Sequence, residues 1–133
     1  MAVSKGGQVN PRKRVLILDD DHDTLDLLEL FLFREFDVLT ALNGFEGLRK
    51  AQEFMPDVIM TDIMMPVMNG ISFINNLKKH AATSSIPVIA VTSFSEKHPI
   101  KSLMNIGFQD VITKPFVKED VERSLTGIVY DAS

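Results

Sequence analysis

The sequence predicts one α/β domain in which helices cover a five-stranded parallel sheet. Two observations carry this prediction: short apolar runs recur five times along the 133 residues, and stretches with helical periodicity separate them. Strands and helices that alternate in this way are typical of consecutive βαβ units, and therefore of a parallel sheet. The length also suits one domain, since domains commonly contain about 100–200 residues.

The predicted strands are short and almost wholly apolar. Most of their residues are aliphatic or β-branched, and turn-forming or acidic residues bound each run. Continuous apolar runs favour strands that are buried on both faces, because half-exposed strands alternate apolar with polar residues. The predicted strands span residues 15–18, 38–41, 58–60, 88–91 and 111–113.

The predicted helices place apolar residues three and four positions apart, which puts them on one helix face. Pro99 suits the first turn of a weaker helix over 99–106, because a first-turn residue needs no hydrogen-bonded N–H. The other expected apolar faces are Leu25, Leu28, Phe31 and Leu32; Phe45, Leu48 and Ala51; Ile71, Ile74 and Leu77; and Val117, Val121, Leu125 and Ile128.

Composition and charge exclude several classes of protein. The chain has no cysteine, so neither a disulfide nor a thiolate zinc site is available. Its net charge of −4 argues against general nucleic-acid binding. No apolar run approaches the roughly 18–20 residues of a membrane span, and the polar start lacks the apolar core of a secretory signal. We therefore expect a cytoplasmic domain over 13–131, preceded by a flexible leader over 1–12.

Polar side chains follow four of the predicted strands. Asp19 and Asp20 follow the first strand, Asp62 the third, Thr92 the fourth and Lys114 the fifth. Because the carboxyl ends of parallel strands meet at one edge of a sheet, these side chains should gather where the strand order reverses. Clustered carboxylates repel one another, and an all-oxygen set suits Mg²⁺ or Mn²⁺. The lysine and the threonine hydroxyl suit the oxygens of a phosphoryl group.

Structural roles account for several neighbouring residues. Asp21 and Asp23 are expected to cap the first helix or to face solvent. The alternate aspartates from Asp19 resemble the start of a calcium-binding loop, but Thr24 and Leu30 stand where that loop needs glycine and glutamate. The histidines lack the spacing of metal ligands and are expected at the surface. They are His22, His80 and His98.

In combination, four segments resemble the receiver domain of bacterial two-component response regulators, the CheY-like family. The match covers about residues 14–130. The resemblance implies a flavodoxin-like (βα)5 fold, a doubly wound sheet with strand order 2-1-3-4-5. The segments are Asp19-Asp20 after the first strand, 56–66 running on to Asn69-Gly70, 87–93, and Gly107 with 110–116.

Carried onto this sequence, the resemblance implies that Asp62 accepts a phosphoryl group with the help of Mg²⁺, for which Mn²⁺ could substitute. Asp20 would ligate the metal directly, and Asp19 directly or through water. Asp62 itself and the backbone carbonyl of Met64 would supply further oxygens.

The resemblance also implies roles for residues at the ends of the last two strands. Lys114 would pair with Asp62 and later with the phosphoryl group. Thr92 would move toward the phosphoryl oxygen, helped by the backbone N–H of Ser93 or Met64. Pro115 would follow a cis peptide bond, a form that only X–Pro bonds adopt at low cost.

One position departs from the usual family pattern. Many members carry an aromatic residue where this chain has Val111, and in them that residue rotates inward on activation. Phe94 or Phe108 could transmit the change instead. The signalling surface is expected on the last helix and its neighbours, and exposure of Met104 or Phe108 would support this placement.

The predicted function is that of a phospho-switch rather than an enzyme acting on a separate substrate. The expected partners are a histidine kinase or phosphotransfer protein, and a downstream protein or an output domain. Nucleic acid and membrane are not expected as direct partners. A phosphorylation-independent interaction module is the main alternative, motivated by Val111, and a small Mg²⁺-dependent phosphatase is a more remote one.

Overall fold

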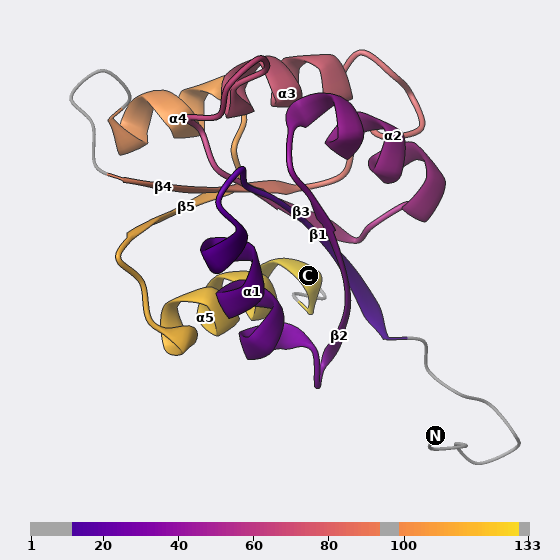
Figure 1. The fold of residues 1–133 in the computed structure, drawn as a ribbon. Helices are drawn as coiled ribbons and strands as arrows, with labels where there is room; N and C mark the ends of the chain where they lie inside the picture. The colour runs from indigo at the N-terminus through magenta and orange to yellow at the C-terminus, as the bar shows by residue number, and fades with distance from the viewer. Residues whose placement is uncertain (1–11, 94–98, 131–133) are drawn as a thin grey trace, which may run out of the picture.

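The computed structural model describes residues 12–93 and 99–130, in which strands and helices alternate (Figure 1). The predicted leader lies outside the described residues except for Arg12, whose guanidinium donates to the backbone carbonyls of Phe33 and Phe36. The elements are β1 (Lys13–Leu18), α1 (His22–Leu32), β2 (Phe36–Ala41), α2 (Gly44–Phe54), β3 (Val58–Thr61), α3 (Gly70–Leu77), β4 (Val88–Ser93), α4 (Ile100–Ile106), β5 (Asp110–Lys114) and α5 (Lys118–Val129).

The sheet is parallel, with strand order β2-β1-β3-β4-β5, so the predicted fold is confirmed. The chain first moves outward from β1 to β2 and then crosses back to β3, which makes β1 and β3 the strands at which the order reverses. Leu18 is level with Ala41 on one side and with Thr61 on the other. The residues that follow these strands therefore leave the sheet at one edge, where ligands of doubly wound folds bind.

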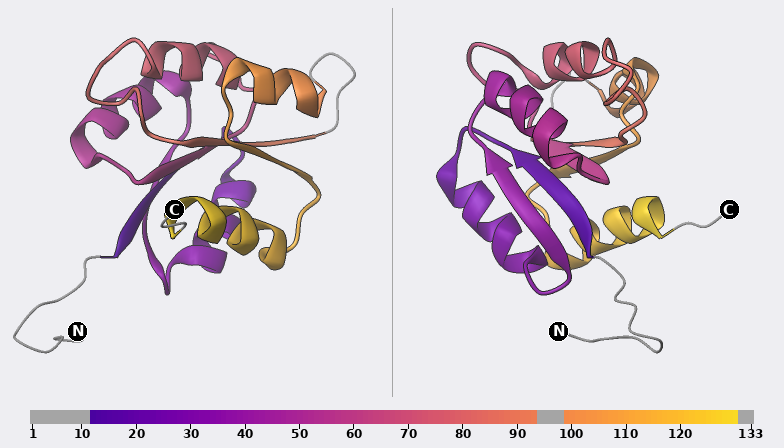
Figure 2. Two further views of the ribbon diagram at one scale, coloured as in Figure 1. Left: turned by 180° about the vertical axis from the view of Figure 1, so that it is seen from behind. Right: turned by 90° about the vertical axis from the view of Figure 1, so that its right-hand side faces the viewer.

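Helices cover both faces of the sheet (Figure 2). On one face, α1 and α5 share a core with Val15 and Ile17, whereas α2, α3 and α4 share a core with Leu16 and Leu18 on the other. Alternate residues of β1 thus enter different cores, which explains why the strand is apolar without alternation. None of the helices in the described ranges is long and apolar enough to cross a membrane.

Two residues predicted on buried helix faces are exposed instead. Phe45 is 59% exposed, because α2 packs through smaller residues. A Cβ atom on Gly47 would lie only 2.4 Å from Leu18 Cδ2, so the helix approaches the sheet closely at this glycine. Val117 is the exposed residue before α5, and Pro99 likewise precedes α4 rather than occupying its first turn.

Candidate functional site at the carboxyl edge of the sheet

Three carboxylates converge where β1 and β3 end. Asp19, Asp20 and Asp62 each offer an oxygen, and the three oxygens lie within 4.8 Å of one another. Backbone hydrogen bonds that extend the sheet position two of them: the Asp62 N–H donates to the Leu18 carbonyl at 2.9 Å, and the Asp19 N–H donates to Ala41 at 3.2 Å. Asp19 and Asp62 are buried, whereas Asp20 is exposed. The predicted juxtaposition is therefore present.

Lys114 reaches two of these carboxylates from the end of β5. Its Nζ lies 3.0 Å from Asp19 Oδ2 and 3.7 Å from Asp62 Oδ2, and its side chain is 23% exposed. Burial lowers the pKa of Lys114, but the hydrogen bond with Asp19 and the charges of both carboxylates outweigh burial, so the pKa lies above its ordinary value. The ammonium group stays charged and neutralises part of the cluster.

The negative charge of the cluster still exceeds what Lys114 provides. Burial, followed by repulsion from Asp19, raises the pKa of Asp62 above the ordinary carboxyl value. Lys114 and the backbone N–H groups of Ile63 and Met64 oppose this rise only in part. Three carboxylates against one ammonium leave a net negative, all-oxygen site, which is the donor set that Mg²⁺ prefers. The residues present therefore fit a divalent cation.

Thr92 is the penultimate residue of β4, on the strand that neighbours the one ending in Lys114. In the β4–β5 register it is level with Thr113, and Ser93 is level with Lys114. Its side chain is buried, and its hydroxyl donates to the Ser93 carbonyl at 3.3 Å. The hydroxyl is thus held by a weak local bond at the same edge of the sheet.

Residues beside the acidic cluster have largely structural roles. Asp21 is the N-cap of α1, and the hydrogen bond from the Thr24 hydroxyl lowers the pKa of its carboxyl, as do backbone N–H groups. Asp23, in the first turn, is exposed as expected. The Lys114–Pro115 bond is cis, as the family resemblance implied. His22 and His80 are exposed, and His98 lies outside the described residues.

The residues expected to take over from the missing aromatic are only partly described. Phe108 is buried in the core and therefore cannot contribute to an exposed signalling surface, whereas Met104 is exposed. Val111 is half-buried against the same core. Phe94 lies outside the described ranges.

Two contributors to the site went unrecognised in the sequence. The Ile63 N–H donates to Asp62 Oδ1 at 2.8 Å. Gly70, at the start of α3, lies so close to the loop that begins at Asp62 that a Cβ atom there would be 2.5 Å from the Asp62 carbonyl oxygen. The Asn69-Gly70 pair was a usable signal, because Asn69 caps α3 through the Ser72 N–H.

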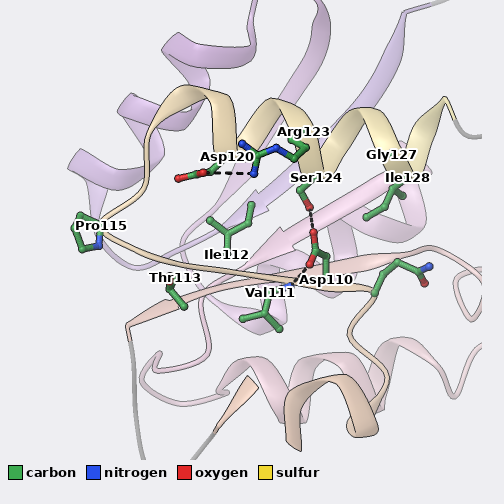
Figure 3. Close-up of a pocket in the computed structure, with 11 residues that line it drawn as sticks. Asp110, Val111, Ile112, Thr113, Pro115, Asp120, Arg123, Ser124, Gly127 and Ile128 are labelled. Carbon is green, nitrogen blue, oxygen red and sulfur yellow. Dashed lines mark hydrogen bonds and ion pairs between the residues drawn. The ribbon is translucent and has the colours of Figure 1, made fainter. Parts of the chain in front are cut away.

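A separate groove of about 480 Å³ lies between β5 and α5 (Figure 3), and Asp19, Asp20 and Asp62 are not among the residues that line it. In it the Ser124 hydroxyl donates to Asp110 Oδ2 at 2.6 Å, and this bond ties α5 to the edge strand. Val111 and Gly127 also line the groove. It adjoins the face on which the signalling surface was expected.

A doubly wound sheet whose carboxyl edge carries an oxygen-only cation site, a lysine and a buried threonine defines a phosphoryl-handling α/β domain. More particularly, the chain belongs to the response regulator receiver domain family, whose model matches residues 15–126. Receiver domains are signalling proteins that bind Mg²⁺ at their acidic site and interact with histidine kinases and output domains.

Individual relatives agree with the family match. The chain is 34% identical over 119 residues to the probable C4-dicarboxylate response regulator DctR of Halalkalibacterium halodurans, covering 87% of this chain and 51% of the relative. It is 33% identical to the chemotaxis protein CheY of Halobacterium salinarum, covering 88% of this chain and 97% of that protein. The structure of Vibrio cholerae CheY4 superposes with a TM-score of 0.82 at 27% identity, over 89% of this chain and 99% of that one.

The chain spans about half the length of several of the curated relatives that it matches. The share is 51% for DctR and 44% for the transcriptional regulatory protein PrrA of Mycobacterium tuberculosis. The match with these longer proteins therefore concerns the receiver portion.

Proposed function

We propose that this chain is a phospho-switch that accepts a phosphoryl group on Asp62 from a histidine kinase or a histidine phosphotransfer protein. The observation that supports this most directly is the position of Lys114 Nζ, 3.0 Å from Asp19 and 3.7 Å from Asp62. A lysine held between carboxylates at this edge neutralises charge where an anionic phosphoryl group has to approach an anionic nucleophile.

The proposed transfer uses the carboxylate of Asp62 as nucleophile. An oxygen of Asp62 forms a bond to phosphorus while the bond from phosphorus to the histidine nitrogen of the donor breaks, and the electron pair leaves with that nitrogen. Lys114 offsets the charge of the incoming group. Thr92 exchanges its bond with the Ser93 carbonyl for one with a phosphoryl oxygen. This exchange couples phosphorylation to a movement at the end of β4.

Asp19, Asp20, Asp62 and the backbone carbonyl of Met64 would hold Mg²⁺ in this proposal, with Mn²⁺ as a substitute. When bound, the metal ion supplies positive charge that reduces repulsion between the carboxylates and the phosphoryl group. The close approach of the three carboxylate oxygens supports this assignment.

The proposed activity is confined to the protein's own phosphorylation and dephosphorylation. We further propose that it operates in the cytoplasm and passes the signal to a downstream protein or to an output domain. A net charge of −4 supports protein partners over direct nucleic-acid binding by this chain.

Intact-mass spectrometry after incubation with acetyl phosphate and Mg²⁺ tests this function. We expect the wild type to gain the mass of one phosphoryl group, and EDTA added beforehand to prevent the gain. Asp62→Asn should abolish it, because an amide is not a nucleophile of this kind. Asp23→Asn is the matched control: it removes an exposed charge from the same region and should leave phosphorylation intact.

A phosphorylation-independent interaction module is the second candidate, and Val111 is the observation that favours it. Binding of Mg²⁺ without any phosphoryl gain, from either acetyl phosphate or a cognate kinase, would support this candidate. Continued release of phosphate from added esters would instead indicate a phosphatase.

Introducing the usual aromatic residue provides a test of the switch. Val111→Tyr should leave phosphorylation of Asp62 within about twofold of wild type, because residue 111 packs against the core rather than against the carboxylates. Phosphorylation can be followed by the same mass measurement. Loss of phosphorylation would show that this part of β5 contributes to the acidic site.

A further inference from the structure

Val67 adopts a backbone conformation that its own side chain disfavours. Its φ is +70°, and Met55 is the only other non-glycine residue with positive φ in the described ranges. A β-branched residue in this region is a genuine outlier, because its Cβ crowds the following carbonyl. The Met68 N–H donates to the Pro66 carbonyl at 2.8 Å, which closes a three-residue turn around Val67. With positive φ at its centre, such a turn is the strained form.

The interactions that maintain this conformation belong to the neighbours of Val67. Val67 itself is 88% exposed and gains almost nothing from packing. Met65 and Met68, on either side, are buried in the core beneath α2, α3 and α4. The Gly70 N–H donates to the Ile63 carbonyl at 2.9 Å and closes the loop. The strain at residue 67 is thus imposed by well-packed surroundings.

The same loop provides the backbone groups that surround the phospho-acceptor. The Ile63 N–H donates to Asp62 Oδ1 at 2.8 Å, and the Met65 N–H donates to the Ile63 carbonyl at 3.1 Å. The backbone N–H of Met64 also opposes the rise in the pKa of the Asp62 carboxyl. The course of the loop therefore decides which backbone groups face the acidic site.

We propose that Val67 is a positioning residue whose positive φ sets the course of residues 63–69 and thereby places the backbone of Ile63 and Met64 beside Asp62. The inference rests on the proposed function in one respect, the binding of Mg²⁺ at this site. Glycine at position 67 adopts positive φ freely and should preserve the loop. Proline holds φ near −65° and should displace it.

Isothermal titration with Mg²⁺ and thermal unfolding of the whole chain test the proposal. We expect Val67→Gly to bind Mg²⁺ as tightly as the wild type and to melt about 3–6 °C higher, since relief of the strained residue stabilises the fold. We expect Val67→Pro to remain folded by circular dichroism and to bind Mg²⁺ at least about tenfold more weakly. Loss of the groups that orient metal ligands typically lowers metal affinity by this factor or more.

Met55 provides a matched control at the opposite edge of the sheet. Its φ is +50°, and it follows α2. Met55→Pro also forbids positive φ and in addition removes the bond from the Met55 N–H to the Ala51 carbonyl, so it should lower the melting temperature more than Val67→Pro. It should nevertheless leave Mg²⁺ affinity unchanged. Equal loss of affinity in both proline variants would overturn a local role for Val67, as would wild-type affinity in Val67→Pro.

A readout without metal separates this inference from the proposed function. Amide chemical shifts of Ile63 and Met64 in metal-free protein should change in Val67→Pro and stay close to wild type in Val67→Gly. Unchanged shifts in Val67→Pro would refute the positioning role. If the wild type bound no Mg²⁺, the proposed function would fail, and these shifts would still decide whether Val67 positions the loop.

Discussion

Lys114→Met is expected to lower the free energy of unfolding by about 2–3 kcal/mol in metal-free buffer, because it leaves the Asp19 and Asp62 carboxylates buried without their cation. Methionine retains most of the apolar part of the lysine side chain, so the lost stability results from removal of the charge rather than from lost packing. This loss is smaller than the full cost of an isolated buried charge, because the Lys114 side chain is 23% exposed and solvent screens the pair in part. Urea unfolding of both proteins, with and without Mg²⁺, measures this change in the free energy of unfolding.

Recovery of the lost stability by a second change should show whether charge repulsion, rather than disrupted packing, destabilises Lys114→Met. Asp62→Asn removes one of the repelling charges and keeps the oxygen that accepts from the Ile63 N–H, so it should recover much of the stability lost in Lys114→Met. Saturating Mg²⁺ should also recover stability, because a cation again neutralises the cluster. Lys118→Met, which breaks only an exposed pair with Glu122, should change stability by less than about 0.5 kcal/mol. An unrecovered loss in the double variant would argue against charge repulsion.

The architecture was predictable because the patterns of burial are simple in this fold. Alternate residues of β1 enter two different cores, so the apolar run in its sequence is continuous. Because such runs alternate with segments of helical periodicity, only a few sheet topologies were possible. Helix faces were less predictable. Phe45 was expected to be buried because it is large and correctly spaced, but Gly47 lets α2 approach Leu18 so closely that the helix packs through its small residues.

The acidic site was predictable for a topological reason. In a parallel sheet the residues after each strand converge, so Asp19, Asp62 and Lys114 could be brought together without knowledge of side-chain positions. Short-range geometry could not be derived in this way. The strained turn at Val67 and the approach of Gly70 to Asp62 depend on how buried neighbours fix the loop, and a sequence pattern does not encode those distances.

Gly70→Ala is expected to destabilise the protein by about 2–3 kcal/mol and to impair phosphorylation of Asp62. The new Cβ atom would lie 2.5 Å from the Asp62 carbonyl oxygen and 3.0 Å from Ile63 Cα. Both are backbone atoms, so rotation of a side chain cannot relieve the overlap, and either α3 or the loop that begins at Asp62 has to move. Because that loop also supplies the Ile63 N–H to Asp62, its displacement should disturb the carboxylate directly.

Chemical denaturation and the acetyl phosphate mass measurement test both parts of this prediction. Gly127→Ala is the matched control, because no atom beyond the neighbouring residues and backbone of α5 itself lies within 4 Å of the corresponding Cβ position. There the same substitution should raise stability by about 0.5–1 kcal/mol through the higher helix propensity of alanine, and phosphorylation should not change. Opposite signs for the two variants would show that close packing around Asp62, rather than glycine as such, sets the cost. A Gly70→Ala protein with wild-type stability and phosphorylation would mean that the loop yields freely, and that the site does not depend on its close contact with α3.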